Sequence, residues 1–140
     1  MDLREEIFSR TEKLWVLALG LEAQRKPLSP LVDLIDWYNN HWLTKNLISK
    51  QISASEGQKS LIAVSELLPV QKILIVGLGE EKDLKDVKTF LTLVHQTVEG
   101  LKEHSPWIVF SEAVPPSFVA DFQKGCGRFD SLAKSKIVIG

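Results

Sequence analysis

The apolar residues of this chain form short continuous runs, separated by longer stretches in which they recur every three or four positions. A run that is apolar at successive positions is typical of a strand buried on both faces of a sheet. Such runs cover 13–20, 60–65, 72–76, 107–110 and 136–139. We predict a strand at each of them, with 60–65 and 72–76 as interior strands because neither alternates polar with apolar residues. A further short strand is predicted near Glu5 to Ser9.

Three stretches with helical spacing are predicted helices: 30–49, 84–103 and 117–124. Ser29 and Pro30 mark the start of the first one, because serine can cap free amides and proline is tolerated at the first helical position. Strands that alternate with helices of this length predict an α/β fold. We therefore expect a single domain over 1–140, with a mixed, mainly parallel sheet and helices on its faces.

A G-x-G turn, formed by Gly77 and Gly79, joins the predicted strand at 72–76 to the helix at 84–103. A dinucleotide site needs a third glycine three residues after the second, and this chain has Lys82 there. Acidic residues at 80, 81 and 83 would repel a phosphate at the helix start. The favoured interpretation is a tight strand exit with Asp83 as helix cap, and the two glycines remain a weak candidate ligand turn.

No catalytic or metal site is predicted from the remaining chemistry-bearing residues. The three histidines, His41, His95 and His104, stand in no zinc-binding pattern. Cys126 is the only cysteine, which excludes an internal disulfide, and no histidine nearby in the sequence would activate it. We expect neither enzymatic activity nor a cofactor.

The charge balance argues against partners that attract through electrostatics alone. The chain has 17 basic and 18 acidic residues in 140, a formal net charge of −1. Proteins that bind nucleic acid or anionic membranes usually carry a basic excess, so we expect neither partner. The charged start of the chain lacks the apolar segment of a signal peptide, and no apolar run approaches the roughly twenty residues of a membrane span. A cytoplasmic protein is expected.

The predicted helix at 30–49 is apolar around more than half of its circumference. Trp37, Val32 and Leu43 lie outside its main apolar stripe. Such a helix is either buried on two sides or leaves an apolar patch for a partner. These three residues are therefore the candidate association face.

Three segments, in this order, resemble one protein family. They are LSPLVDLID at 28–36, GQKSLIAV at 57–64 and KILIVGLGEEKDLKDVKTFLTLVHQTVEGL at 72–101. Together they resemble the N-terminal domain of the leucyl (cytosol) aminopeptidases over about residues 13–115, most specifically in V-G-L-G-x-E-x-x-L at 76–84. The resemblance implies a macro-domain-like fold without catalytic residues, since that family's metal ions and catalytic side chains belong to a separate domain. No metal motif of that domain occurs in this sequence.

Two functions follow as hypotheses. The first is a stand-alone, non-catalytic module that associates with protein, either with itself or with a full-length aminopeptidase. The alternative is a macro-like domain that binds a small molecule such as ADP-ribose or a related nucleotide. An unrecognised hydrolase that uses Cys126 or a histidine is the least favoured.

Overall fold

The computed structural model describes residues 2–25, 27–84 and 86–140. Its centre is a five-stranded sheet in the order β2-β3-β1-β4-β5. The strands β1 (Leu14–Gly20), β3 (Lys72–Gly79), β4 (Trp107–Phe110) and β5 (Lys136–Ile139) run parallel. β2 (Lys59–Ile62) is antiparallel to β3. The predicted mixed, mainly parallel sheet is confirmed.

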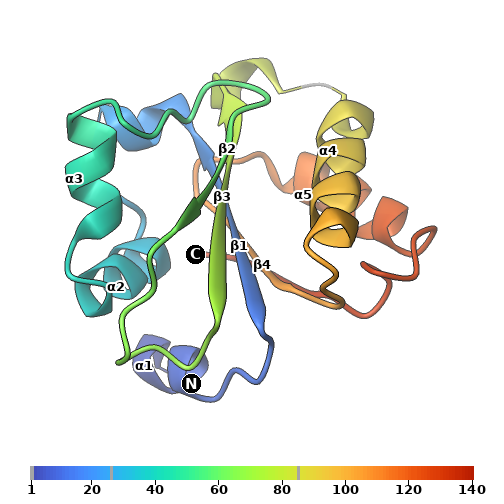
Figure 1. Cartoon of the computed structure of the whole chain (residues 1–140). Coiled ribbons are helices and arrows are strands. Elements are labelled where there is room, and N and C mark those ends of the chain that lie inside the picture. The colour runs from blue at the N-terminus through green and yellow to red at the C-terminus, as the bar shows by residue number, and fades with distance from the viewer. Residues whose placement is uncertain (1, 26, 85) are drawn as a thin grey trace.

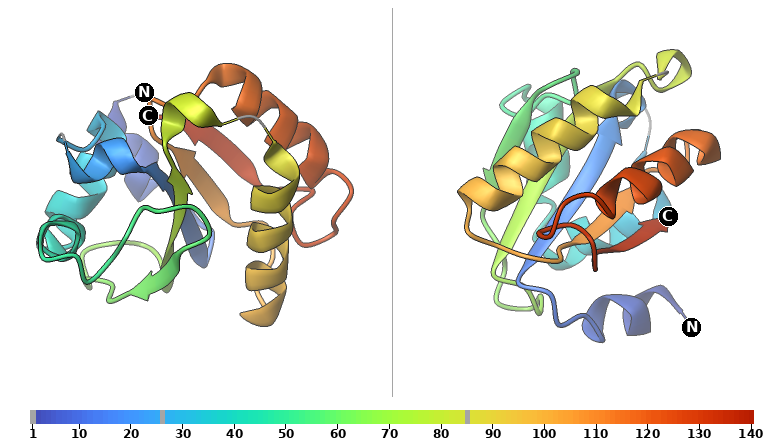
Figure 2. Two further views of the ribbon diagram at one scale, coloured as in Figure 1. Left: turned by 90° about the horizontal axis from the view of Figure 1, so that it is seen from above. Right: turned by 90° about the vertical axis from the view of Figure 1, so that its right-hand side faces the viewer.

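Two helical layers cover the sheet, as Figures 1 and 2 show. One face carries α2 (Pro30–Tyr38) and α3 (Trp42–Ile48), and the other carries α4 (Val87–Gly100) and α5 (Pro116–Cys126). The helix α1 (Leu3–Phe8) packs beside α2. Alternate residues of β1 point into the two resulting cores, and all seven are buried. Burial on both faces explains why the run at 13–20 is continuously apolar.

The predicted strand at 60–65 exists, but its interior placement is wrong. β2 lies at the edge of the sheet, and Leu61 is half exposed there. Edge strands commonly carry exposed charged residues, and the first residue of β2, Lys59, is exposed.

The predicted strand near Glu5 to Ser9 is wrong, because this segment is the helix α1. The Asp2 carboxylate accepts a hydrogen bond from the backbone N–H of Glu5, which caps the first turn. Glu5 and Glu6 lie in that turn, where negative charge suits the helix dipole. Six residues were too few for their spacing to separate helix from strand.

The predicted helix at 30–49 is broken into α2 and α3. Asn40 and His41 have positive φ angles of 61° and 56°, which end one helix and begin the next. The buried Asp36 carboxylate accepts the backbone N–H of Leu43 at 2.8 Å and that of Thr44 at 3.2 Å. Asp36 therefore caps α3 from the helix before it, an arrangement that helical spacing alone does not reveal.

The predicted helix at 84–103 is confirmed in type but begins later, at Val87. Asp86, and not Asp83, caps it by accepting the N–H of Lys88 at 2.9 Å. Asp83 ends a short 3₁₀ helix, η2 (Glu81–Asp83), between β3 and α4. The G-x-G turn is thus separated from the start of α4.

No helix within the described ranges is long and apolar enough to cross a membrane. The cytoplasmic location stays a prediction from the sequence.

Candidate functional site

The connections that leave the central strand and its two neighbours go to opposite faces of the sheet. After β1 the chain continues to α2 and α3 on one face, whereas β3 and β4 lead to α4 and α5 on the other. Figure 2 shows the two helical layers on either side of the sheet, most clearly in its left view. Diverging connections leave a crevice at the carboxyl ends of the strands, where ligands of open α/β sheets bind.

A cavity of about 530 Å³ lies at this point and is called the edge cavity here. It is built by three segments, which follow β1, β3 and β4. Its described lining residues are Leu19, Glu22, Ala23, Pro27, Leu28, Ser29, Pro30, Glu81, Lys82, Ser111, Glu112, Ala113 and Pro115. The size is within the range of small-molecule sites, and the walls combine apolar groups with a few polar ones, as such sites do.

Glu81 forms a buried part of this lining, with only 4% of its surface exposed. Its Oε1 accepts a hydrogen bond from the backbone N–H of Glu22 at 3.1 Å, which ties the segment after β3 to the segment after β1. The position depends on Gly20, because a Cβ added there would lie 2.0 Å from Cγ of Glu81. The sequence analysis did not identify Glu81 as a site residue. The available signal was Gly20, because a glycine at the end of a buried strand indicates that another group packs closely there.

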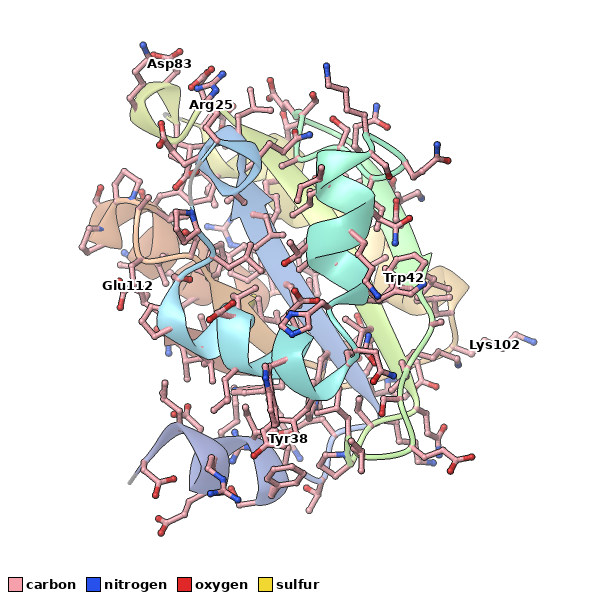
Figure 3. The ribbon with its side chains drawn as sticks, turned by 90° about the vertical axis from the view of Figure 1, so that its left-hand side faces the viewer. Arg25, Tyr38, Trp42, Asp83, Lys102 and Glu112 are labelled. Carbon is pink, nitrogen blue, oxygen red and sulfur yellow. The ribbon has the colours of Figure 1, made fainter. Side chains whose placement is uncertain are left out.

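An ion pair also joins the same two segments. Arg25 follows the short 3₁₀ helix η1 (Leu21–Gln24), and its guanidinium donates to both Glu80 oxygens, at 2.7 and 3.2 Å. Figure 3 labels Arg25 and Asp83, both at the upper end of the sheet in that view. The hydrogen bond from Arg25 lowers the pKa of the Glu80 carboxyl, and the same bond raises the pKa of Arg25.

The far wall is the segment from Ser111 to Pro115 after β4. It is fixed by backbone hydrogen bonds, from the N–H of Ser111 to the carbonyl of Ala18 and from that of Val114 to the carbonyl of Ser111. The Glu112 side chain is exposed on this wall and is labelled in Figure 3. The opposite wall begins with Ser29, whose hydroxyl donates to the carbonyl of Gly140 at 2.7 Å. Hydrogen bonds therefore fix both of these walls to neighbouring segments of the chain.

The G-x-G turn lies outside the described lining of the edge cavity. Its backbone amides form hydrogen bonds with another segment of the same chain. The N–H of Gly77 donates to the carbonyl of Gln58 at 2.7 Å, and that of Gly79 to the carbonyl of Ala54 at 2.9 Å. A Cβ on Gly77 would lie 2.1 Å from the carbonyl oxygen of Ser55. The structure thus supports the favoured interpretation of a turn, because both amides that would cradle a phosphate are already used.

The three residues of the candidate association face are not brought together on a surface. Val32 and Leu43 are buried in the core, at 0% and 1% exposed, and only Trp37 is exposed, at 59%. Val32 belongs to the buried face of α2 and Leu43 to the buried face of α3, whereas Trp37 lies outside the buried face of α2. Trp37 lines a shallow groove between α1 and α2, called the helix groove, with Leu3, Arg4, Leu28, Pro30, Asp33, Leu34 and Tyr38.

The other candidates for chemistry lie apart from the edge cavity. Cys126 is buried in α5, and burial raises the pKa of its thiol to about 12, so it is a poor nucleophile at neutral pH. His95 stacks on Phe129, and its Nδ1 lies 3.3 Å from the Ser131 hydroxyl. Among the described residues no group of three or more acidic, histidine or cysteine side chains is placed to hold a metal ion.

No family model matches this chain, and no curated protein matches it. Among solved structures, the macrodomain of Mycobacterium tuberculosis DarG superposes with a TM-score of 0.60, over 95% of this chain and 91% of that chain. The fold is macrodomain-like. At 9% sequence identity this likeness concerns the fold alone. It confirms the fold that the aminopeptidase resemblance implied, whereas an origin in that family stays a prediction.

Proposed function

We propose that this macrodomain-like chain binds a small molecule of the nucleotide class in the edge cavity. ADP-ribose and its nucleoside portion are the first ligands to test. The observation that carries the proposal is the position of the cavity, at the carboxyl ends of β1, β3 and β4 where their connections diverge. The fold shared with a macrodomain supports the same ligand class, as an analogy.

The walls of the cavity suit a ligand with a flat apolar ring and polar substituents. Leu19, Ala23 and Leu28 offer apolar surface, and Glu112 and Lys82 offer charged groups of opposite sign. Ring surfaces gain from apolar burial, while amino and hydroxyl groups donate to carboxylates. We propose binding without catalysis, because Cys126 is buried with a raised thiol pKa and His95 packs against Phe129, both apart from the described lining.

A thermal-shift panel with ADP-ribose, AMP and adenosine tests this function. A ligand at 100 times its dissociation constant adds about 2.7 kcal/mol to the free energy of unfolding, which raises the melting temperature by several degrees. Ala113→Trp should abolish the shift, because Ala113 is an exposed residue of the cavity wall. Ala120→Trp, at an exposed position of α5 outside the described lining, is the matched control. A flat panel would contradict the proposal.

Association through the helix groove is a second candidate function. The exposed Trp37 ring packs edge-on against Tyr38, which packs in the same way against Phe8. Exposed aromatic residues of this kind often anchor protein interfaces. If the chain associates with itself or with an aminopeptidase through this groove, Trp37→Ala should weaken the complex in sedimentation velocity without lowering the melting temperature. A monodisperse monomer that retains no such partner would contradict this second function.

A further inference from the structure

A second cavity, of about 450 Å³, lies at the opposite end of the strands from the edge cavity. It is built where the chain enters the parallel strands β1, β4 and β5, and it is called the lysine pocket here. Its size is within the range of small-molecule sites. Its lining includes Lys13, Lys102, Lys134 and Lys136, together with Glu12 and Glu103.

The four lysines of this pocket come from three separate segments of the chain. Lys13 directly precedes β1, and Lys102 lies in the turn after α4. Lys134 and Lys136 lie at the start of β5. All four residues are exposed, and within the described ranges none of them forms an ion pair. The fold therefore gathers positive charges that are spread along the sequence.

The two glutamates of the pocket are held by cations outside its described lining. The Glu12 carboxylate lies 3.7 Å from Nε of Arg10, and the Glu103 carboxylate accepts a hydrogen bond from Nζ of Lys72 at 3.2 Å. Both glutamate side chains are mostly buried, at 14% and 13% exposed, whereas the four lysines are exposed. The surface that a ligand would meet is therefore dominated by ammonium groups.

The turn that carries Lys102 is tied to the segment that carries Lys134. Lys102 and Ser105 have positive φ angles of 58° and 50°, a conformation that residues other than glycine rarely adopt. The backbone N–H of Ser105 donates to the carbonyl of Ser131 at 2.7 Å, which joins this turn to the chain before β5. A backbone that is held in this way lowers the cost of ordering the site when a ligand binds.

The charge of the pocket indicates the class of ligand. Positive groups gathered in one place repel one another, and a bound anion offsets that repulsion. Each ammonium group offers three donors and binds phosphate as a point charge. Four lysines exceed what a single phosphate group needs, so the pocket suits an anion with several phosphate groups.

We propose that the lysine pocket binds a compact anion that carries several phosphate groups, such as a tripolyphosphate chain. The site is separate from the edge cavity, so this inference goes beyond the proposed function and does not depend on it. The net charge of −1 for the whole chain conceals this local excess of positive charge.

Isothermal titration of the whole chain with tripolyphosphate tests the proposal. A double variant with Lys134→Gln and Lys136→Gln removes two charges from the pocket. The matched control, with Lys45→Gln and Lys124→Gln, removes the same charge at exposed positions of α3 and α5 outside the described lining. The pocket variant is expected to bind about tenfold or more weakly than the control, because two hydrogen bonds between charged groups are lost.

Equal affinities of the two double variants, or a wild type that does not bind tripolyphosphate, would overturn the proposal. A wild type that binds inorganic phosphate as tightly as tripolyphosphate would also overturn it, because the site is assigned to several phosphate groups. Amide chemical shifts of the ¹⁵N-labelled wild type give a readout without any variant. Tripolyphosphate should shift the signals of Lys13, Lys102 and Lys136, and shifts confined to other regions would contradict the assignment.

Titration with ATP separates the two sources of such an anion, a free polyphosphate and a nucleotide. It is carried out on Ala113→Trp, in which the new side chain fills the edge cavity, so that the lysine pocket is measured by itself. ATP that binds as tightly as tripolyphosphate supports recognition of the phosphate chain alone. ATP that binds more tightly supports a nucleotide as the ligand of the lysine pocket, and ATP that binds more weakly supports a free polyphosphate.

Discussion

The carboxyl ends of β3 and β1 lie next to each other in the sheet, yet they have opposite uses. At the end of β3, backbone carbonyls of residues 54 and 58 occupy the amides of Gly79 and Gly77, and the turn is closed by the chain itself. At the end of β1, Gly20 leaves room for the buried Glu81 side chain, and the neighbouring segments enclose a cavity. Both ends carry a glycine because another part of the chain comes too close for a Cβ atom. At Gly77 it is the backbone of Ser55, and at Gly20 it is the side chain of Glu81. The difference teaches that the direction of the connections, and not the G-x-G motif, locates the site.

The largest expected loss of stability is at the carboxyl end of β3, where the chain itself occupies the turn. Gly77→Ala should lower the free energy of unfolding by about 3 kcal/mol or more, because the new Cβ would lie 2.1 Å from the backbone oxygen of Ser55. Chemical denaturation measures this loss. Gly100→Ala is the matched control, since nothing lies within 4 Å of its added Cβ. A loss in Gly77→Ala no larger than that of the control would mean that the turn is open.

A smaller loss of stability is expected at the end of β1. Gly20→Ala would place its Cβ against the Glu81 side chain, which can shift more easily than backbone. We expect a loss of about 1–2 kcal/mol, with a change in adenosine affinity because the cavity lining moves. Denaturation and titration of the same preparation measure both. A change in stability without any change in adenosine affinity would mean that the position of Glu81 does not affect ligand binding.

A change in affinity without a change in stability is expected on the far wall. Glu112→Ala should weaken adenosine binding by about 1 kcal/mol through the loss of one acceptor. Its stability should change by less than about 0.5 kcal/mol, because the side chain is exposed. Glu66→Ala, at an exposed position outside the described lining, is the control for titration calorimetry. Equal affinities of the two variants would remove Glu112 from the site.

The smallest effect on stability is expected for the exposed ion pair between Arg25 and Glu80. The pKa of Glu80 is lowered in the folded state, so its stabilising contribution is present above the ordinary glutamate pKa and is lost as the pH falls through the lowered value. The difference in melting temperature between the wild type and Glu80→Gln should therefore shrink on acidification. Salt should also reduce it, because the pair is exposed. A difference that grows at low pH would contradict the assignment.

The sequence predicted the parallel strands well and the site poorly. Burial on both faces leaves continuous apolar runs, such as those of β1 and β4, which local reading detects. The break between α2 and α3 escaped because Asp36 reaches across seven residues to cap Leu43, while the apolar spacing continues through the turn. Val32 and Leu43 were consequently expected on a surface that does not exist.

The edge cavity could not be found from local patterns for a different reason. Its walls come from segments that follow three strands, and their proximity depends on the order of the strands in the sheet. Glu81 appeared in the sequence as one of several neighbouring acidic residues, and only tertiary contacts with Gly20 and Glu22 distinguish it. At Gly77 and Gly79, charge and spacing argued against phosphate, and both amides donate to carbonyls within the chain, whereas the predicted cap at Asp83 is wrong.

The most direct measurement of the central claim is a titration of the ¹⁵N-labelled protein with adenosine, followed by amide chemical shifts. The account predicts shifts at Ala23, Leu28 and Ala113, which line the edge cavity, and none at Gly77 and Gly79. Shifts centred on the two glycines, or on the helix groove around Trp37, with an unchanged edge cavity would contradict it.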